Sequence, residues 1–303
     1  MKFVRQADYL GILSSPPVRL ACLSLVAVLL ASAQDFTPVK LDVIAEKLTF
    51  TEGPAWSKDG YLIFSDTPND RLLKWTPGHP VEIFREKANG PSGNAFDLDG
   101  RLYTCETRAR RVTRTDRSGA IEVLADKFDG KRLNAPSHIA VGRTGSIYFT
   151  DPAFGYQSDH RELDFYGVYH LSSKGGLKVI AKPQGRPNGI ALSPNGKLLY
   201  VTNSDERNIR AYDVDKNGDT SNERVLVAKV EGIPGGIHID EKGNLFVAAA
   251  GIAVYSPDGR LLHTIATHEP PSNCTFGEAD LKSLMITARG KLYRARMEDK
   301  GAN

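Results

Sequence analysis

From about residue 40 onward, apolar and polar residues alternate in short runs that are separated by Gly, Asn, Asp and Pro. Runs such as YLIFSD from Tyr61 and LLYVTN from Leu198 are rich in aliphatic and aromatic residues of the kind that favour β-strands. No stretch of this region shows the period of about 3.6 residues that predicts an amphipathic helix. The pattern therefore predicts an all-β protein.

Six segments of the chain share one order of residues: a Pro, a short polar pair, a large apolar residue, a turn and a β-rich run. The large apolar residues that align the segments are Trp56, Phe96, Val141, Leu192, Ile239 and Phe276. The units are spaced by 37 to 51 residues, and each continues with further β-like runs. Repeats of this length with four short strands each predict a six-bladed β-propeller, whereas a β-sandwich would not explain the register.

The last unit is one strand short, because the chain ends soon after the run KLYRARM at 291–297. The run LDVIAEKL at 41–48 resembles the other β-like runs and could supply the missing fourth strand. We therefore expect residues 40–48 to pair with 291–297, so that the N-terminal strand closes the last blade. Closing the ring in this way removes a free sheet edge and ties the two ends of the domain together.

The N-terminus predicts export. Residues 20–33 read LACLSLVAVLLASA after a basic segment, and Ala31-Ser32-Ala33 has the small-x-small pattern of a signal-peptidase site. The apolar run of about 14 residues is shorter than the roughly 20 that a membrane span requires. We interpret 1–33 as a signal peptide and 34–303 as a single propeller domain in the periplasm or outside the cell. A retained anchor and a buried core helix are the alternatives.

The charge balance excludes some partners. The chain has 39 Lys and Arg against 36 Asp and Glu, a net charge of +3, and removing 1–33 leaves about +1. Such a balance favours neither nucleic acid nor an anionic membrane surface. We expect a small-molecule substrate, such as a lactone or sugar acid, and no stable membrane span after cleavage of the signal peptide.

Two cysteines remain in the predicted domain. Cys105 and Cys274 fall in the second and sixth units, which are not neighbours in the ring. An exported protein could form a disulfide, but these two positions lie too far apart in the register. We predict that both are small buried apolar residues with free thiols.

The position after the repeated Pro places one residue of each unit at the mouth of the central channel; in the first unit Thr51 stands in place of that Pro. By register these positions are Glu52, Ser92, Ser137, Asn188, Gly235 and Ser272. A carboxylate and an amide oxygen that converge on one axis suit a hard cation such as Ca²⁺ or Mg²⁺. The alternative is that Glu52 and Asn188 only accept hydrogen bonds from backbone amides at the strand starts. His138 and His238 are the histidines closest to the channel by register.

Four stretches carry a resemblance to a known family: TEGPAW, KRLNAPSHIAVGRTGSIYFTDPAFGY, RPNGIALSPNGKLLYVTN and PPSNCTFGEADLKSLMITARGKLYRARM. They resemble the regucalcin (senescence marker protein)/gluconolactonase family of six-bladed propeller lactonases, over nearly the whole predicted domain. The resemblance implies one divalent metal in the channel, usually Ca²⁺ or Zn²⁺, and hydrolysis of sugar lactones or related esters. The family's metal-binding Glu and Asn fall on Glu52 and Asn188.

The sequence departs from that family at the other functional positions. The Asn of the family's Pro-Asn-Asp is Ser137 here, followed by His138, and the Asp of its Pro-Asp-Gly is Gly235. The Asn of Gly-Pro-Asn-Gly is Ser92. Only one acidic ligand is left, which predicts weaker binding of a divalent ion because the number of charged ligands tunes affinity.

Two functions remain open from the sequence. The first is a metal-dependent lactone or ester hydrolase, in which Glu52 and Asn188 hold Ca²⁺ (or Zn²⁺ or Mg²⁺) and His138 is the remaining candidate base. Substrate-binding candidates are Ser137, Arg132 and Ser92. The second is an exported, non-catalytic propeller that binds a ligand at a degenerate metal site, because propellers support both kinds of function.

Overall fold

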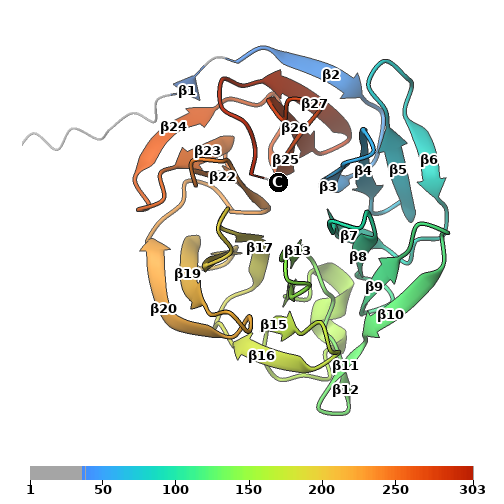
Figure 1. Ribbon diagram of the computed structural model, residues 1–303, viewed down its shortest axis with the longest axis vertical. Coiled ribbons are helices and arrows are strands. Elements are labelled where there is room, and N and C mark those ends of the chain that lie inside the picture. Colours follow the sequence, from blue (N-terminus) through green and yellow to red (C-terminus); the bar gives the residue numbers. More distant parts are fainter. Residues whose placement is uncertain (1–35, 38, 303) are drawn as a thin grey trace, which may run out of the picture. The chain divides into compact units, whose positions relative to one another are not determined.

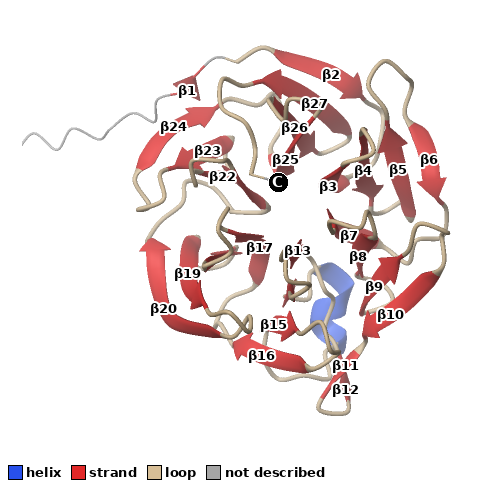
Figure 2. Ribbon diagram, viewed as in Figure 1, coloured by secondary structure: helices blue, strands red, loops and turns tan. Residues whose placement is uncertain are grey.

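The structure is a computed structural model that describes residues 36–37 and 39–302. The predicted signal peptide at 1–33 lies outside the described residues. Six antiparallel sheets are arranged as blades around a central channel (Figure 1), and strands and loops make up almost all of the ribbon (Figure 2). The prediction of a six-bladed β-propeller with four strands per blade is confirmed.

The first three blades follow the chain order, from the innermost strand outward. Blade one is β3 (Thr51–Ser57), β4 (Tyr61–Asp66), β5 (Arg71–Trp75) and β6 (Glu82–Arg85). Blade two is β7 (Pro91–Phe96), β8 (Leu102–Glu106), β9 (Arg111–Thr115) and β10 (Ile121–Ala125). Blade three is β13 (Ile139–Val141), β14 (Ile147–Asp151), β15 (Gly167–Leu171) and β16 (Leu177–Ala181).

The last three blades continue the same order, and the sixth takes its outer strand from the start of the domain. Blade four is β17 (Pro187–Leu192), β18 (Leu198–Asn203), β19 (Asn208–Val214) and β20 (Thr220–Val227). Blade five is β21 (Ile237–Ile239), β22 (Leu245–Ala248), β23 (Ile252–Tyr255) and β24 (Leu261–Ile265). Blade six is β25 (Pro271–Gly277), β26 (Ser283–Ala288), β27 (Lys291–Arg296) and β2 (Leu41–Ala45).

The N-terminal strand closes the ring as predicted. Strand β2 pairs antiparallel with β27, with Leu41 opposite Ala295 and Val43 opposite Tyr293. The sequence did not predict β1 (Phe36–Thr37), which adds a parallel fifth strand to the outer edge of blade five. Two further elements interrupt the regular pattern: a hairpin of β11 (Lys127–Phe128) with β12 (Lys131–Arg132), and the 3-10 helix η1 (Gly155–His160).

The innermost strands approach one another closely because four blades carry glycine one position after the channel-mouth residue. These glycines are Gly53, Gly93, Gly189 and Gly236. The Gly93 amide donates to Ser137 O at 2.7 Å, and a Cβ at position 93 would lie 2.6 Å from the same oxygen. Only glycine permits this backbone contact between blades. In the other two blades the equivalent positions are His138 and Asn273, whose side chains occupy the axis instead.

Apolar side chains between adjacent blades form the core. Phe246 of blade five and Phe276 of blade six meet edge to face, with ring centroids 5.0 Å apart, which is a favourable aromatic geometry. Cys105 and Cys274 are both buried and free, as predicted. Within the described part of the chain, no helix is long and apolar enough to cross a membrane.

Candidate active site in the central channel

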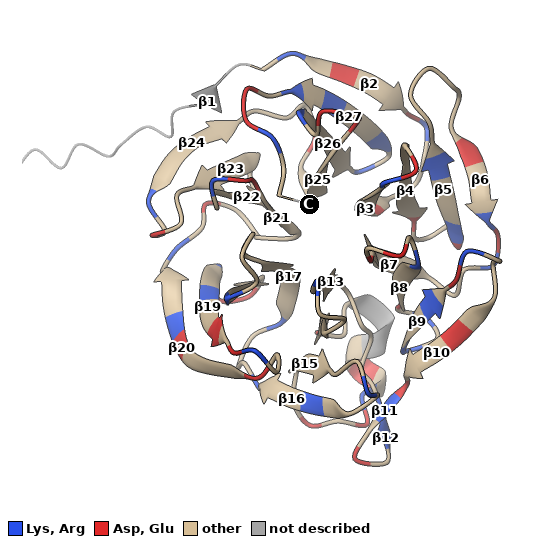
Figure 3. Cartoon of the chain, in the orientation of Figure 1, with Lys and Arg blue, Asp and Glu red and all other residues tan. Residues whose placement is uncertain are grey.

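The innermost strands begin at one end of the channel, which we call the ring side, and end in tight turns at the other, which we call the turn side. At the ring side Glu52, Ser92, Ser137 and Ser272 are buried, and Asn188 and Gly235 are half-buried. Glu52 is the only charged residue on the six described innermost strands. Figure 3 shows the remaining acidic and basic residues mainly on outer strands and turns.

The Glu52 carboxylate accepts hydrogen bonds from three directions through one oxygen. His138 Nε2 and Asn273 Nδ2 each lie 3.1 Å from Glu52 Oε2, and the Gly53 amide donates to the same oxygen. Burial disfavours the charged form, but the charge and hydrogen bond of His138, together with Asn273 and the Gly53 amide, hold the pKa of the Glu52 carboxyl below its ordinary value. Glu52 is therefore a buried anion at neutral pH.

A chain of hydrogen bonds continues from Glu52 across blades three and four. His138 Nδ1 lies 3.1 Å from Ser137 Oγ, and Ser137 Oγ lies 3.3 Å from Asn188 Oδ1. Asn188 Nδ2 donates to Ser204 Oγ at 3.0 Å, and Ser204 in turn donates to the carbonyl of Pro234. The arrangement places an imidazole between a carboxylate and a hydroxyl group, with 3.1 Å on each side.

The backbone around Ser137 and His138 is held by β14. Asp151 at the end of β14 accepts the amides of Asn134 and Ala135, each at 2.7 Å, and burial raises the pKa of Asp151 to about 7 despite these two donors. Thr150 Oγ1 accepts the His138 amide and donates to Asn188 O. Residues of β14, the second strand of blade three, therefore position the backbone that carries Ser137 and His138.

The other predicted site residues lie apart from this chain. Ser92 contributes its carbonyl, which accepts from Ser65 Oγ and Asn94 Nδ2. Arg132 is exposed on the β11–β12 hairpin and donates to Ala109 O at 3.0 Å. The Ser272 hydroxyl donates to Thr51 O at 2.7 Å instead of joining the Glu52 cluster.

The sequence interpretation missed two functional neighbours. Asn273 donates to Glu52, and Ser204 anchors Asn188. Asn273 directly follows Ser272, so extending the repeat register by one residue would have identified it. Ser204 lies just after a second strand, a position that the ring register did not include.

The residues present do not fit the metal centre that the family pattern implies. No group of three or more His, Cys, Asp or Glu that could hold a metal ion occurs among residues 36–37 and 39–302. One oxygen of Glu52 already accepts three hydrogen bonds. A Cβ at Gly235 would lie 2.5 Å from Ser272 O, so the backbone would have to shift before a carboxylate side chain could fit there. We therefore derive no catalytic step through a metal ion.

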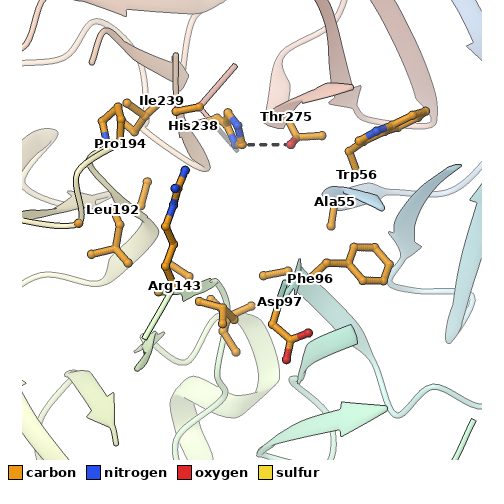
Figure 4. Close-up of a pocket in the computed structure, with 18 of the residues that line it drawn as sticks. Ala55, Trp56, Phe96, Asp97, Arg143, Leu192, Pro194, His238, Ile239 and Thr275 are labelled. Atoms are coloured by element: carbon orange, nitrogen blue, oxygen red, sulfur yellow. Dashed lines mark hydrogen bonds between the residues drawn. The ribbon is translucent and has the colours of Figure 1, made fainter. Parts of the chain in front are cut away.

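A cavity of about 1290 Å³ fills the channel on the turn side (Figure 4). His138 and Asn273 belong both to its lining and to the Glu52 cluster, so they separate the two sides. Large apolar side chains, such as Trp56, Phe96 and Leu192, form much of its wall. The channel thus has a polar end and an apolar end.

Comparison with known proteins identifies the class. The family described as SMP-30/Gluconolactonase/LRE-like region matches residues 50–290. The chain therefore belongs to the SMP-30/gluconolactonase family of β-propeller proteins, as the resemblance predicted.

Particular relatives sharpen this assignment. A gluconolactonase of Zymomonas mobilis is 35% identical over 298 residues, covering 88% of this chain and 83% of that protein. The structure of a gluconolactonase from Xanthomonas campestris is 33% identical with a TM-score of 0.80, covering 85% of this chain and 89% of the other. A regucalcin structure from Agrobacterium tumefaciens, described as a calcium-binding protein, has a TM-score of 0.77 at 17% identity and supports the fold alone.

Proposed function

We propose that the protein hydrolyses lactones or related esters, with sugar lactones as the first candidates, at the ring-side cluster of Glu52, Ser137, His138 and Asn188. Family membership and the two gluconolactonases described above support the reaction class. The observation that carries the proposal within this chain is the continuous hydrogen-bonded chain from Glu52 through His138 to Ser137.

The tautomer of His138 follows from its partners. A neutral imidazole has one donor nitrogen and one acceptor nitrogen. Because Nε2 faces the Glu52 carboxylate, which can only accept, Nε2 carries the proton. Nδ1 is then an acceptor 3.1 Å from Ser137 Oγ. The single hydroxyl proton of Ser137 can be donated either to Nδ1 or to Asn188 Oδ1 at 3.3 Å, and the proposed reaction uses the donation to Nδ1. A carboxylate, an imidazole and a hydroxyl in this order form the arrangement that activates a serine nucleophile.

The proposed reaction needs only these groups and water. Ser137 Oγ attacks the lactone carbonyl carbon while its proton passes to His138 Nδ1. The ring C–O bond breaks, the ring oxygen takes the proton from Nδ1, and the opened acid is held as an ester of Ser137. Water then repeats the sequence, releasing the hydroxy acid and restoring the hydroxyl. Glu52 stabilises the imidazolium at each stage. Ser92 and Arg132 remain predicted substrate contacts, and Asn188 remains a predicted metal ligand.

Hydrolysis of glucono-δ-lactone by the purified domain tests the proposal. Ser137→Ala and His138→Gln should each lower kcat/KM by about 10³-fold or more, since loss of one member of such a unit removes most of its effect. Exposed Ser173→Ala and His79→Gln are matched controls that should retain activity. Full activity of Ser137→Ala would exclude the serine route.

The metal remains a separate prediction. The prediction of one divalent ion, Ca²⁺ first and Zn²⁺ or Mg²⁺ next, is supported by the resemblance to relatives named regucalcin. Calorimetric titration of chelator-treated protein should give at most weak binding, with a Kd of about 10⁻⁴ M or higher, because Glu52 is the sole carboxylate on the six described innermost strands. Activity that disappears with EDTA and returns with Ca²⁺ would favour a metal route over the serine route.

A non-catalytic binding propeller is the second candidate, and Gly235 in place of an acidic residue is the observation that favours it. In that case gluconate or the lactone binds without turnover, and Glu52→Gln weakens binding alone. Export is also a proposal: the N-terminal sequence of the mature protein should begin at Gln34.

A further inference from the structure

The turn-side cavity is not used by the proposed reaction. Six channel-facing positions, one per blade, precede the large apolar residues that align the repeats, and all of them line this cavity. They are Ala55, Ala95, Ala140, Ala191, His238 and Thr275. We call these six residues the alanine layer, because its four alanines make the channel wide and leave His238 and Thr275 as its polar members (Figure 4).

His238 is held in this layer by one weak contact. Its Nδ1 lies 3.4 Å from Thr275 Oγ1, which is a long distance, and its buried Nε2 has no hydrogen-bond partner among the described residues. An imidazole held so loosely can turn about its Cβ–Cγ bond and bring Nε2 to the cavity that the ring lines. A buried polar atom with no partner costs free energy, and a bound molecule that supplies one removes that cost.

The polar side chains one level deeper in the channel are already satisfied. Asn273 Nδ2 donates to Glu52, and Asn273 Oδ1 accepts the amide of Cys274 at 2.8 Å. Both ring nitrogens of His138 have partners in the Glu52 cluster. A polar group on a ligand that enters from the turn side therefore finds its open partner at His238.

The charged side chains that line the cavity balance one another. Four are cationic: Lys58, Arg143, Lys197 and Lys216. Four are anionic: Asp59, Asp97, Asp215 and Glu278. Ala302, the last described residue, also lines the cavity and adds no side-chain charge. Four positive charges against four negative ones give the described lining no net charge that would select an ion of either sign.

Most of these charges are also engaged. Asp59, Asp97 and Glu278 are ion-paired with arginines at 3.1, 2.6 and 2.9 Å, and Asp215 accepts two backbone amides, each at 2.8 Å. Arg143, which extends into the cavity in Figure 4, has an interaction of its own. Deeper in, alanine methyl groups cannot hydrogen-bond a charge, and burial there lowers the pKa of His238 to about 4. The cavity therefore favours a neutral molecule.

We propose that the turn-side cavity is a second ligand site, which takes a neutral molecule with an apolar body and one hydroxyl group. The body fills the space inside the alanine layer, next to Trp56, Phe96 and Leu192, and the hydroxyl group hydrogen-bonds His238 Nε2. A hydroxyl group suits this position because it both donates and accepts, whichever nitrogen of His238 carries the proton. The site is independent of lactone hydrolysis, because none of these residues takes part in the Glu52–His138–Ser137 chain.

Four probes with one naphthalene body test the proposal: 2-naphthol, 2-methylnaphthalene, 2-naphthoate and 2-naphthylmethylammonium. Equilibrium dialysis of the purified protein at neutral pH should give one saturable site for 2-naphthol. The methyl, carboxylate and ammonium probes should each bind about tenfold more weakly, because they lack the hydroxyl group or carry a charge. The affinity for 2-naphthol should not change with salt, since a neutral ligand leaves no charge to screen.

Variants locate the hydroxyl group. His238→Phe keeps the bulk and removes Nε2, so it should weaken 2-naphthol about tenfold and change 2-methylnaphthalene by less than about twofold. His268→Phe, outside the cavity, is the matched control and should change neither probe. Lys216→Gln, which removes an exposed charge of the lining, should change the affinity for 2-naphthol by less than about twofold.

Filling the channel gives the strongest test. Ala95→Phe and Ala140→Phe, from different blades, should each abolish binding of 2-naphthol while circular dichroism shows an unchanged fold. Ala120→Phe, in an exposed turn, is the control and should retain binding. Equal affinity for 2-naphthol and 2-methylnaphthalene, or tighter binding of a charged probe, would overturn the assignment of a neutral alcohol. Unchanged binding to either folded channel variant, or no saturable binding of any probe to the parent, would overturn the site itself.

Discussion

The two ends of the channel are built from the same six strands, yet they differ in how well their polar side chains are hydrogen-bonded. At the ring side Glu52, His138, Ser137 and Asn188 are each other's partners within a buried chain. At the turn side His238 projects among alanines, and its Nε2 has no hydrogen-bond partner among the described residues. A satisfied network holds its members in one arrangement, as chemistry requires, whereas an unsatisfied group in a roomy cavity is suited to binding a ligand.

A shift of a few residues along a strand produces this difference. The glycine layer brings the backbones of adjacent blades together beside the Glu52 cluster, and the alanine layer two positions further along leaves space. Blade three departs from the first pattern through His138, and blade five departs from the second through His238. Each end of the channel thus owes its character to one histidine in a layer of small residues.

The largest effect should come from removing the charge at the ring side. Glu52→Gln keeps the shape of the side chain but leaves His138 without an anion to stabilise its protonated form. Lactone hydrolysis should fall by about 10³–10⁴-fold. Circular dichroism should show an unchanged fold, which separates a chemical effect from a structural one.

Glu122→Gln is the matched control, because Glu122 is an exposed partner of Arg114 on the outer strand of blade two. It should leave hydrolysis unchanged. Full activity of Glu52→Gln, with the fold intact, would mean that the ring-side reaction does not need this charge.

A smaller but general effect should follow from disturbing the glycine layer. In Gly93→Ala the new Cβ would lie 2.6 Å from Ser137 O and 2.7 Å from His138 Cα, so the backbone between blades two and three must shift. We expect a loss of about 2–4 kcal/mol in the free energy of unfolding, as for other severe steric substitutions. Denaturant titration measures it.

Gly176→Ala is the control for that substitution. It lies in a turn where the new Cβ would be 3.3 Å from the flexible end of Ser172 and no backbone atom is in the way. Its stability should change by less than about 0.5 kcal/mol. Equal stability of the two variants would show that the blades do not depend on close backbone approach at the axis.

The repeat register was sufficient to predict the fold and the membership of the ring side, because one aligned residue per blade determines which positions face the channel. It predicted the pairing of 40–48 with 291–297 and the separation of Cys105 from Cys274. It did not predict which partner each side chain chooses. Ser272 hydrogen-bonds Thr51 O, and Asn273 rather than Ser272 reaches Glu52, since these contacts depend on how neighbouring blades meet.

The turn-side cavity could not be recognised from the sequence for a related reason. An alanine in a strand is unremarkable by itself, and only closure of the ring brings the four alanines to one level around the axis. The added strand β1 was equally invisible, because two residues are too few to show a pattern.

The smallest effect is a pH dependence of stability that arises from the turn side. The pKa of His238 is lowered by burial from 6.5 to about 4, so the folded protein remains unprotonated there while the unfolded chain takes up a proton below pH 6.5. Stability contributed by neutral His238 is therefore complete above pH 6.5 and is lost as the pH falls toward 4, by up to about 3 kcal/mol. Asp151, with its pKa raised from 3.8 to about 7, acts in the opposite sense over the whole of this range, so the pH dependence of the parent protein alone does not isolate His238. The difference in unfolding free energy between His238→Phe and the parent removes that background.

This difference should favour the variant increasingly between pH 6.5 and 4.5, and His268→Phe should show no such trend. A pH-independent difference for His238→Phe would mean that His238 is solvated in the folded protein, and the contrast between a satisfied ring side and an unsatisfied turn side would then be lost.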